Sequence, residues 1–491
     1  MLVYRWNVPE NKWHIAMKKL IILIITISAL LVACSEEADF SYNPQYSLEF
    51  SSDTVSFDTL FTSVNSPTAT FVVRNRNNKS LRISSVQLAG GEESGFSVLV
   101  DGQWGALMNN LEVRAKDSIF VLASVCLERN GAKTPVAVRD TLFFDLESGV
   151  RQSVILEAYG LDAVFMRGAV IDTDTLLAAG NYIVYDSLVV ASGVTLGIAP
   201  GSTLYFHDKA FMRVEGTLDA QGTAAEPITF RGDRTDNMFS YLPYDRIPGQ
   251  WDGVLFSSTS NNNILRHCDI HSANYGIKVE RGDTVQQRLL LESSKVHNFH
   301  GNALELSMAR ATVLNSLIAN AQGNCVKVCG GNVEFIHCTI ANYYVWKVRD
   351  VALALHNSID GVPASLDNAL FANCVISGSK DDELMGYYTS FSDTVECRFN
   401  YRFENSFVNT PDVGDTCFVN VVYDNPESEF FGKMNFRTID NEIFLYDFHL
   451  TPESAARGIA SGKYFNAVPF DIDGVARPVD AADAGCYQFV E

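Results

Sequence analysis

His267-Cys268-Asp269-Ile270 is the first of four related phrases in the middle of the chain, followed by Ser293-Ser294-Lys295-Val296, Asn315-Ser316-Leu317-Ile318 and His337-Cys338-Thr339-Ile340. The aliphatic ends of these phrases lie 26, 22 and 22 residues apart, and Cys or Ser stands two positions before each end. A coil of this length cannot bury an apolar face by itself and must stack on its neighbours. The repeat therefore predicts a solenoid whose interior holds the small and aliphatic side chains.

The sequence pattern of a solenoid begins well before the repeated phrase. From about residue 168, short runs rich in Val, Ile, Leu, Thr and Phe are separated by Gly and Pro turns, without helical crossovers. Strands that pair in parallel without intervening helices are achieved by winding the chain as a solenoid. We therefore expect an all-β chain in which residues 168–491 form a right-handed parallel β-helix with a C-terminal cap.

Several phrases in this region resemble those of the single-stranded right-handed β-helix proteins of the pectate-lyase-like superfamily. They include Pro200-Gly201-Ser202, Pro227-Ile228-Thr229-Phe230 and Trp251-Asp252-Gly253-Val254. Near the end, Phe448-His449-Leu450-Thr451-Pro452 resembles the closing segment of many bacterial surface β-helices. The superfamily contains lyases, hydrolases, esterases and non-enzymatic adhesins. The resemblance thus implies a fold and leaves the reaction open.

Residues 47–163 have the pattern of a separate β-sandwich. Eight short strands are expected, with turn signals such as Gly90-Gly91 and Asn130-Gly131 between them. They span residues 47–50, 54–58, 70–74, 81–86, 96–100, 118–125, 141–145 and 153–158. The pattern Phe71-x-Val73-x-Asn75 resembles immunoglobulin-like modules of the ASH type. That resemblance implies a spacer or binding module, and no residue here indicates catalysis.

The first 46 residues have the organisation of a lipoprotein leader and tether. Met17-Lys18-Lys19 opens a positively charged segment, residues 20–31 are apolar, and Leu31-Val32-Ala33-Cys34 resembles the lipobox of bacterial lipoproteins. We expect residues 1–33 to be a signal peptide that starts at Met17, Cys34 to be lipidated, and residues 34–46 to form a tether. This implies lipid anchoring at the outer membrane. Glu36-Glu37 resembles a surface-export signal, so exposure outside the cell is a further expectation.

The net charge narrows the range of partners. The 491 residues carry a formal charge of −21, and the chain after residue 33 carries −24 because the leader holds four basic residues and one acidic residue. Nucleic-acid phosphates require a basic face, so a nucleic-acid partner is not expected. Adsorption to an anionic membrane is disfavoured for the same reason. A polysaccharide or a surface partner protein remains, with membrane attachment through the lipid anchor alone.

The cysteines favour packing over metal binding. Nine follow Cys34, and Cys268 and Cys338 occupy inward repeat positions where a buried thiol acts as a small apolar group. Cys325-x3-Cys329 has no second Cys or His pair at zinc-finger spacing and is interpreted as core. Asp471-x-Asp473-Gly474 begins like a calcium loop but lacks the downstream Glu, which favours a simple turn. No metal or other cofactor is therefore expected, although calcium stays open.

Chemistry is expected only at outward positions on the first two coils. Side chains alternate along a strand, so inward Cys268 and Ile270 place Asp269 and His271 outside, and the next coil places Lys295 and His297 outside. Stacking sets Asp269 beside Lys295 and His271 beside His297. These four residues would form either an acid–base cluster at a carbohydrate groove or a solvated ladder with one surface ion pair. The following coils present Leu317, Ala319, Thr339 and Ala341, which end the polar patch.

The function stays open between two classes. Polygalacturonase motifs and the calcium carboxylates of pectate lyases are missing, so no catalytic residue is assigned beyond the speculative patch. This favours a non-catalytic cell-surface lipoprotein that binds glycans or partner molecules through its β-helix. The alternative is a polysaccharide lyase or glycoside hydrolase acting on a groove of the β-helix. A purely structural envelope protein is the third possibility.

Overall fold

The computed structural model describes residues 17–19, 39–392, 396–412, 414–424 and 434–491. The predicted leader apart from Met17–Lys19, the predicted lipidation residue Cys34 and the first part of the predicted tether lie outside the described residues. The chain divides into two compact units, one of residues 1–128 with 136–160 and one of residues 129–135 with 161–491. In the described part, no helix has the length and apolar character needed to cross a membrane.

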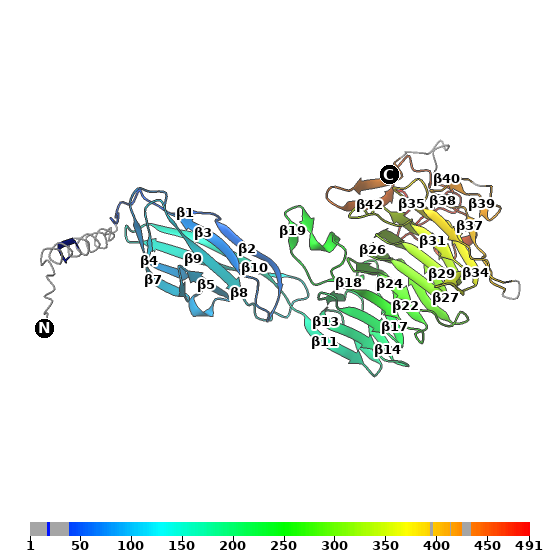
Figure 1. Cartoon of the computed structure of the whole chain (residues 1–491), viewed down its shortest axis with the longest axis horizontal. Coiled ribbons are helices and arrows are strands. Elements are labelled where there is room, and N and C mark those ends of the chain that lie inside the picture. Colours follow the sequence, from blue (N-terminus) through cyan, green and yellow to red (C-terminus); the bar gives the residue numbers. More distant parts are fainter. Residues whose placement is uncertain (1–16, 20–38, 393–395, 413, 425–433) are drawn as a thin grey trace, which may run out of the picture. The chain divides into compact units, whose positions relative to one another are not determined.

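The first unit consists of two antiparallel five-stranded sheets, with strand orders β1-β3-β8-β5-β6 and β2-β10-β9-β4-β7 (Figure 1). The first sheet contains β1 (Glu49–Phe50), β3 (Ala69–Arg74), β8 (Ser118–Val125), β5 (Phe96–Val100) and β6 (Gln103–Trp104). The second contains β2 (Thr54–Phe61), β10 (Arg151–Leu161), β9 (Val136–Leu146), β4 (Leu81–Leu88) and β7 (Leu107–Val113). All eight expected strands are present; β6 and β7 were not expected.

One hydrophobic core joins the two sheets. Phe71 and Val121 come from the first sheet and pack with Phe144 and Leu156 of the second, all nearly inaccessible to solvent. In β8, buried residues alternate with exposed or half-buried ones, as expected for a strand with one face on a core. The predicted sandwich is therefore confirmed at the level of two packed antiparallel sheets.

The second unit is a parallel β-helix. Its 26 strands form one continuous sheet in which the strands of successive coils pair in parallel, and Figure 1 shows them as rungs. They fall into three stacks. The stack that carries the sequence repeat contains β13 (Asn181–Val190), β15 (Thr203–Phe206), β18 (Ile228–Gly232), β23 (Cys268–His271), β26 (Lys295–Phe299), β28 (Leu317–Ala321), β30 (Thr339–Asn342), β35 (Val375–Gly378), β38 (Phe407–Val408) and β40 (Val422–Tyr423).

The other two stacks close each coil. One contains β12 (Thr175–Leu177), β14 (Thr195–Ile198), β17 (Thr217–Gln221), β22 (Asn263–Arg266), β25 (Gln287–Glu292), β27 (Leu304–Leu314), β29 (Val326–Ile336), β34 (Leu366–Ala372), β37 (Arg402–Glu404) and β39 (Phe418–Val419). The other contains β16 (Phe211–Val214), β21 (Gly253–Phe256), β24 (Ile277–Val279), β31 (Leu353–His356) and β36 (Leu384–Tyr387), together with parts of β13, β27 and β29. The first strand, β11 (Val164–Ile171), pairs with β13.

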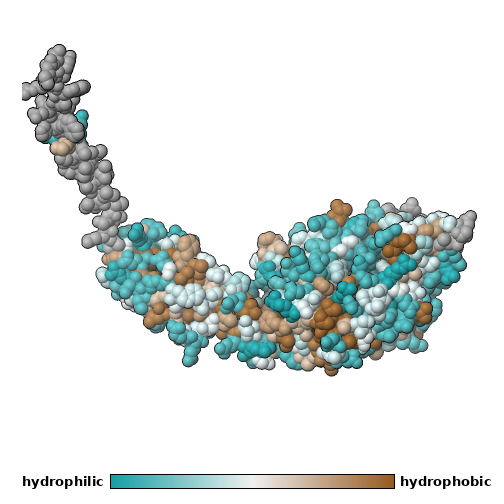
Figure 2. Space-filling view, turned by 60° about the horizontal axis from the view of Figure 1, so that its bottom comes forward, coloured by the Kyte–Doolittle hydropathy of each residue, from teal (hydrophilic) through white to brown (hydrophobic). Residues whose placement is uncertain are grey.

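Inward and outward positions alternate along the rungs. In β16, Met212 and Val214 are buried while Arg213 between them is exposed. On the face shown in Figure 2, hydrophobic residues accordingly form separate patches within a mostly hydrophilic surface. The predicted parallel β-helix with an apolar interior is confirmed.

The repeated phrase forms the corner before a strand of the repeat stack and the first residues of that strand. Its leading residues His267, Ser293, Asn315 and His337 all have positive φ, between 45° and 53°, which bends the chain into the next strand. The small residues that follow are buried. Beyond packing, they form a hydrogen-bond ladder: the Cys268 amide donates to Ser294 Oγ at 3.0 Å, and the Ser294 amide donates to Ser316 Oγ at 3.2 Å. The Ser side chain at this position therefore contributes a hydrogen bond in addition to its small size.

Ser294→Ala is expected to destabilise the β-helix unit by about 1–3 kcal/mol, because the buried Cys268 amide loses its acceptor. Equilibrium urea unfolding followed by tryptophan fluorescence measures the change. Ser294→Cys is the matched control, since other coils carry Cys at this position. An unchanged midpoint for Ser294→Ala would contradict a stabilising ladder.

Aromatic rings stack through the interior of the later coils. Phe335, Phe371 and Phe403 lie on successive rungs with ring centroids 4.8 and 5.0 Å apart and interplanar angles of 14° and 11°. Phe418 continues the stack from Phe403 at 4.7 Å. All but Phe418 are fully buried. The stack fills the centre of the coil with one ring per rung.

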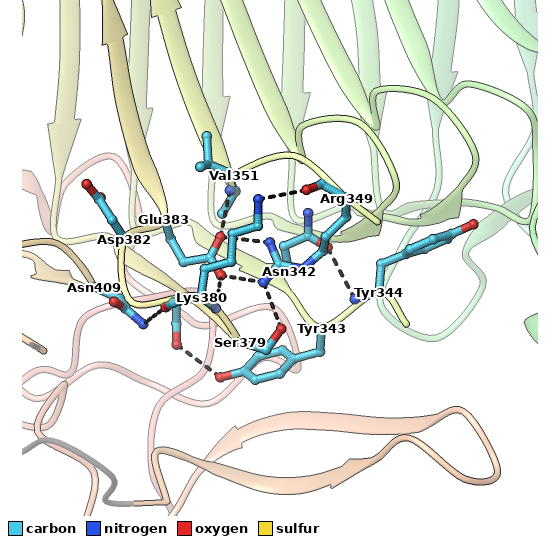
Figure 3. A network of polar contacts seen from close by, with 12 residues as sticks. Asn342, Tyr343, Tyr344, Arg349, Val351, Ser379, Lys380, Asp382, Glu383 and Asn409 are labelled. Atoms are coloured by element: carbon cyan, nitrogen blue, oxygen red, sulfur yellow. Dashed lines mark hydrogen bonds and ion pairs between the residues drawn. The ribbon is translucent and has the colours of Figure 1, made fainter. Parts of the chain in front are cut away.

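A buried ion pair closes one corner of the β-helix (Figure 3). Arg349 binds both oxygens of Glu383, whose side chain has no solvent exposure. The Ala352 and Lys380 amides also donate to this carboxylate, at 2.9 and 2.8 Å. Burial raises the pKa of Glu383, although Arg349 and the amides act in the opposite direction. The carboxylate thus holds residues 349–352 against residues 380–383, next to the pairing of β31 with β36.

The C-terminal segment packs on the outer side of the repeat stack. β41 (Phe436–Asp440) and β42 (Leu445–Leu450) form an antiparallel hairpin. Phe436, Phe448 and Leu450 of this hairpin share a core with the outward Leu317 and Ala319, together with Ala341, Val375 and Phe407 of later rungs. The outward positions after the first two coils are apolar because this segment covers them.

Candidate functional site

The four outward residues predicted on the first two coils lie in the expected register. Asp269 pairs with Lys295 and His271 with His297 across β23 and β26, and the next rung presents Leu317 and Ala319. The apolar rungs are covered by the C-terminal segment, whereas the charged rungs are not part of that core. The polar patch therefore lies at the boundary of the covered region.

His271 is nevertheless buried, with only 5% of its surface exposed. The segment between β18 and β21 forms a small hairpin of β19 (Asn237–Phe239) and β20 (Leu242–Pro243), followed by a 3-10 turn, Tyr244–Arg246. That turn brings Asp245 against His271. The interpretation of the patch as a fully solvated ladder is therefore wrong for His271.

His271 is held between two carboxylates. Its Nδ1 lies 2.9 Å from Asp269 Oδ1 and its Nε2 lies 2.8 Å from Asp245 Oδ1. His297 Nε2 lies 3.1 Å from the same oxygen of Asp269, and the two imidazole rings stack with centroids 5.0 Å apart. Arg231 also contacts Asp245, at 2.9 Å. Asp269 is thus shared by two imidazoles from adjacent rungs.

The cluster is strongly charge-coupled. Burial alone would lower the pKa of His271, but Asp269 and Asp245 outweigh it and raise that pKa to about 9. Burial would conversely raise the pKa of Asp245, yet His271 and Arg231 bring it to about 2. The pKa of Asp269 is held well below its usual value by His271 and His297, against the effect of burial. At neutral pH, His271 is an imidazolium between two ionised carboxylates.

A second imidazole lies between carboxylates on the C-terminal segment. His449 of β42 binds Asp447 through Nδ1 and Asp473 Oδ2 through Nε2, the latter at 2.7 Å. Asp473 stands in the turn predicted for Asp471-x-Asp473-Gly474, where Asp471 Oδ1 accepts from the Asp473 and Val475 amides. The Asp471 carboxylate therefore stabilises the predicted turn.

Lys295 and Tyr487 connect the two clusters. The Lys295 ammonium lies 6.0 Å from the centre of the Tyr487 ring, and that ring lies 4.0 Å from the His449 ring. Lys295 also contributes to lowering the pKa of Asp473, after the hydrogen bond from His449. The pKa of Asp447 is also lowered. Burial would raise it, but hydrogen bonds from the His449 amide and ring outweigh that effect.

The His449 ion pairs predict a pH-dependent contribution to stability. The hydrogen bond to Asp473 is the largest cause that raises the pKa of His449, so the folded value lies above the ordinary value of about 6.5. A raised folded pKa stabilises fully below pH 6.5 and loses that contribution as pH rises through the folded pKa. We expect His449→Gln to lower the urea midpoint at pH 6 and to approach wild type at pH 9. A midpoint difference that is constant with pH would contradict this.

The two clusters face one pocket of about 350 Å³. Its polar side includes Asp245, Asp269, Lys295 and His297, and its other side is formed by 444–449 of the C-terminal hairpin together with Tyr487. Figure 1 shows this hairpin and the β19 hairpin on the same side of the β-helix, and Arg246 Nη1 donates to Ile443 O at 3.2 Å. A larger pocket of about 450 Å³ near His267 and Glu292 lacks such a gathering of charges. We therefore take the 350 Å³ pocket as the candidate site.

Half of this site was not foreseen from the sequence. The patch Asp269, His271, Lys295 and His297 is brought together, but Asp245, Asp447, His449, Asp473 and Tyr487 were missed as site residues. Two signals were available. The polar insertion before Trp251 lies over the repeat face, and the C-terminal phrases carry His449 and Asp473 among apolar residues.

Cys268 and Cys338 point inward as predicted, and Cys325 and Cys329 are buried as well. The nine described cysteines are free thiols, and six of them are buried. Trp251 is fully buried against Phe206, at 4.2 Å between ring centroids.

No protein-family model matches the chain, and no curated protein matches it significantly. Among solved structures, a family 123 glycoside hydrolase from Clostridium perfringens is similar at 7% identity over 25% of this chain and 30% of that chain, with a TM-score of 0.18. A protein of unknown function from Porphyromonas gingivalis W83 is 13% identical over 26% and 60% of the two chains, with a TM-score of 0.18. The catalytic domain of a GH87 α-1,3-glucanase in complex with tetrasaccharides is 11% identical over 73% and 87%, with a TM-score of 0.22.

The matched regions span less than two thirds of the first two of these chains. Similarity at these TM-scores gives no information about activity. The function proposed below therefore rests on the residues of this chain.

Proposed function

We propose that the β-helix unit binds a glycan in the pocket between β23, β26 and the C-terminal hairpin. The observation that carries the proposal is the composition of the pocket: the β-helix side offers carboxylate, ammonium and imidazole groups, and the C-terminal side offers aromatic rings together with Asp447 and His449. A sugar presents hydroxyl groups at its edges and C–H groups on its ring faces. Such a ligand is matched by a pocket that offers both kinds of surface at once.

The polar groups of the pocket supply both hydrogen-bond donors and acceptors. Asp269 and Asp447 offer carboxylate oxygens, while Lys295 and His297 offer nitrogen donors. The cationic Lys295, Arg246 and His271 offset much of the negative charge of the carboxylates around the pocket. This balance favours a neutral glycan over a polyanionic one, in a chain whose overall charge is −21.

The aromatic side offers a stacking surface. Phe444 stacks on Trp346 with ring centroids 4.3 Å apart and an interplanar angle of 13°, and Trp346 is 37% exposed. Tyr446 stacks on the buried Phe448 at 6.1 Å, so its position is fixed by the core beneath it. Rigid, partly exposed rings lose little conformational freedom when a ligand binds.

Glycan cleavage is the second candidate, and His449 favours it. The hydrogen bonds to Asp473 and Asp447 raise the pKa of His449 and favour its protonated form, which can serve as a general acid beside the pocket. Asp269 remains ionised on the β-helix side and can serve as a general base. The same pair of residues fits hydrolysis or β-elimination. In hydrolysis the base takes a proton from water, and in β-elimination it takes a proton from the sugar ring.

A screen of neutral and acidic polysaccharides tests both candidates. Retention without product supports binding alone, whereas new reducing ends indicate hydrolysis and unsaturated products indicate a lyase. Phe444→Ala is expected to weaken retention at least ten-fold, about 1.4 kcal/mol, because half of the stacked ring pair is lost. Trp104→Ala is the matched control, an exposed aromatic residue of the sandwich unit. Equal retention by both variants, or no retained glycan at all, would overturn the proposal.

We also propose that Cys34 anchors the protein to the outer membrane, with polysaccharide or a surface protein as its partner. The support is the order of charged, apolar and lipobox-like segments up to Cys34. Metabolic labelling with a fatty acid is expected to mark the wild type and not Cys34→Ser. Protease treatment of intact cells then tests outward exposure: digestion supports it, and protection places the protein on the inner side.

A further inference from the structure

We propose that Asp269, His271 and His297 form a binding site for one divalent transition-metal ion, with Zn²⁺ as the representative ion. The ligand atoms of these three residues lie within 4.8 Å of one another. The site opens on the glycan pocket but does not depend on the glycan proposal, since the metal can be measured by itself.

The two distances from Asp269 to the imidazoles match those between neighbouring ligands of one metal ion. Asp269 Oδ1 lies 2.9 Å from His271 Nδ1 and 3.1 Å from His297 Nε2. With metal–ligand bonds of about 2.0–2.1 Å, neighbouring ligands of a six- or four-coordinate ion lie about 2.9–3.4 Å apart. A bound ion takes the place of the protons that now join the imidazoles to Asp269.

The surroundings of His271 resemble those of a metal ligand. While Nδ1 faces Asp269, the opposite nitrogen Nε2 is bonded to Asp245 Oδ1 at 2.8 Å. An imidazole that ligates a metal through one nitrogen commonly donates from the other to a carboxylate, which fixes the ring and increases its basicity. Asp245 is held in turn by Arg231. The buried His271 is therefore already oriented for coordination.

His297 completes the site from the neighbouring rung. Its ring lies nearly parallel to that of His271, at 15°, so it must turn to direct Nε2 at a shared ion. The side chain is 25% exposed, and among the described residues its only hydrogen bond is the one to Asp269. A modest rotation is therefore open to it.

The set of ligands indicates both the ion and its use. Two imidazoles and one carboxylate suit zinc and similar first-row ions, whereas calcium prefers oxygen ligands alone. Asp269 and His297 line the pocket, so the remaining coordination positions face a bound ligand. Three protein ligands with an open position are the pattern of zinc sites that bind a water or substrate oxygen. A hydroxyl group of a glycan is such an oxygen.

Titration calorimetry with Zn²⁺, and Co²⁺ absorption as a spectroscopic probe, tests the proposal on the full chain. We expect one ion per chain with a Kd in the micromolar range or below. His271→Ala and His297→Ala are each expected to weaken binding at least 100-fold, and Asp245→Asn about 10–100-fold because it supports His271 indirectly. His207→Ala is the matched control, since His207 pairs with Asp233 but belongs to no cluster of three potential metal ligands in the described part of the chain.

The partly exposed His297 keeps the test informative if the buried His271 variant fails to fold. Absence of saturable Zn²⁺ binding, or binding unchanged in His297→Ala, would overturn the metal site. So would a Co²⁺ spectrum with thiolate bands, which would assign the ion to free cysteines such as the exposed Cys126. Phe444→Ala is expected to keep zinc affinity while losing glycan retention, so failure of one proposal is distinguishable from failure of the other.

Discussion

Arg349→Ala is expected to destabilise the β-helix unit by about 3–5 kcal/mol, because it leaves the fully buried Glu383 carboxylate without its bidentate partner. The remaining Ala352 and Lys380 amides cannot neutralise the charge. The pKa of Glu383, already raised by burial, then rises further, and the variant regains part of its stability at low pH as the carboxyl is protonated. Urea unfolding at pH 7 and pH 5, followed by tryptophan fluorescence, measures both effects.

The matched control is Arg398→Ala. Arg398 also pairs with carboxylates, Glu396 and Asp367, but on the exposed surface. Solvent screens such pairs, so no measurable change in stability is expected. If the Arg349 and Arg398 variants behaved alike, the buried pair would not stabilise the corner that Figure 3 shows.

Phe371→Ala is expected to cost about 3–5 kcal/mol, because it removes the middle ring of the stack and leaves a cavity between two rungs. The neighbours Phe335 and Phe403 are fixed by strand pairing on both sides and can close the gap only partly. Phe371→Leu retains most of the volume and should cost much less. The same unfolding measurement compares the two variants.

Phe239→Ala serves as the control for this series. Phe239 is 54% exposed on the β19 hairpin, so its removal creates no cavity. A loss for Phe371→Ala no greater than that of Phe239→Ala would show that the ring stack does not support the coil.

The 22-residue phrase made the β-helix predictable, because each coil repeats the same corner, small residue and aliphatic residue. Ile270, Val296, Ile318 and Ile340 are all buried as the alternation requires. The hydrogen-bond ladder could not be predicted in the same way, because Ser294 and Cys268 are both explained by their small size alone. Only the structure shows that the Ser294 hydroxyl accepts from the Cys268 amide of the preceding coil.

The site residues could be predicted only on the repeat strands, where the spacing of the phrase sets which residues of neighbouring coils pair. Asp269 and His271 are separated from Lys295 and His297 by one coil, and strand pairing alone sets them side by side. Asp245 and His449 reach the same place through an irregular insertion and a segment about 150 residues further along. No local period encodes those contacts, so their partners could not be deduced from sequence.

The C-terminal hairpin has a consequence for how the protein is made. During synthesis, the outward row of Leu317, Ala319 and Ala341 emerges long before Phe436, Phe448 and Leu450 can cover it. Until then the growing β-helix presents an apolar stripe of the kind that chaperones bind. Because the same hairpin delivers Asp447 and His449, the pocket is finished by the step that hides the stripe. Docking of the hairpin therefore completes the pocket and covers the chaperone-binding stripe in the same step.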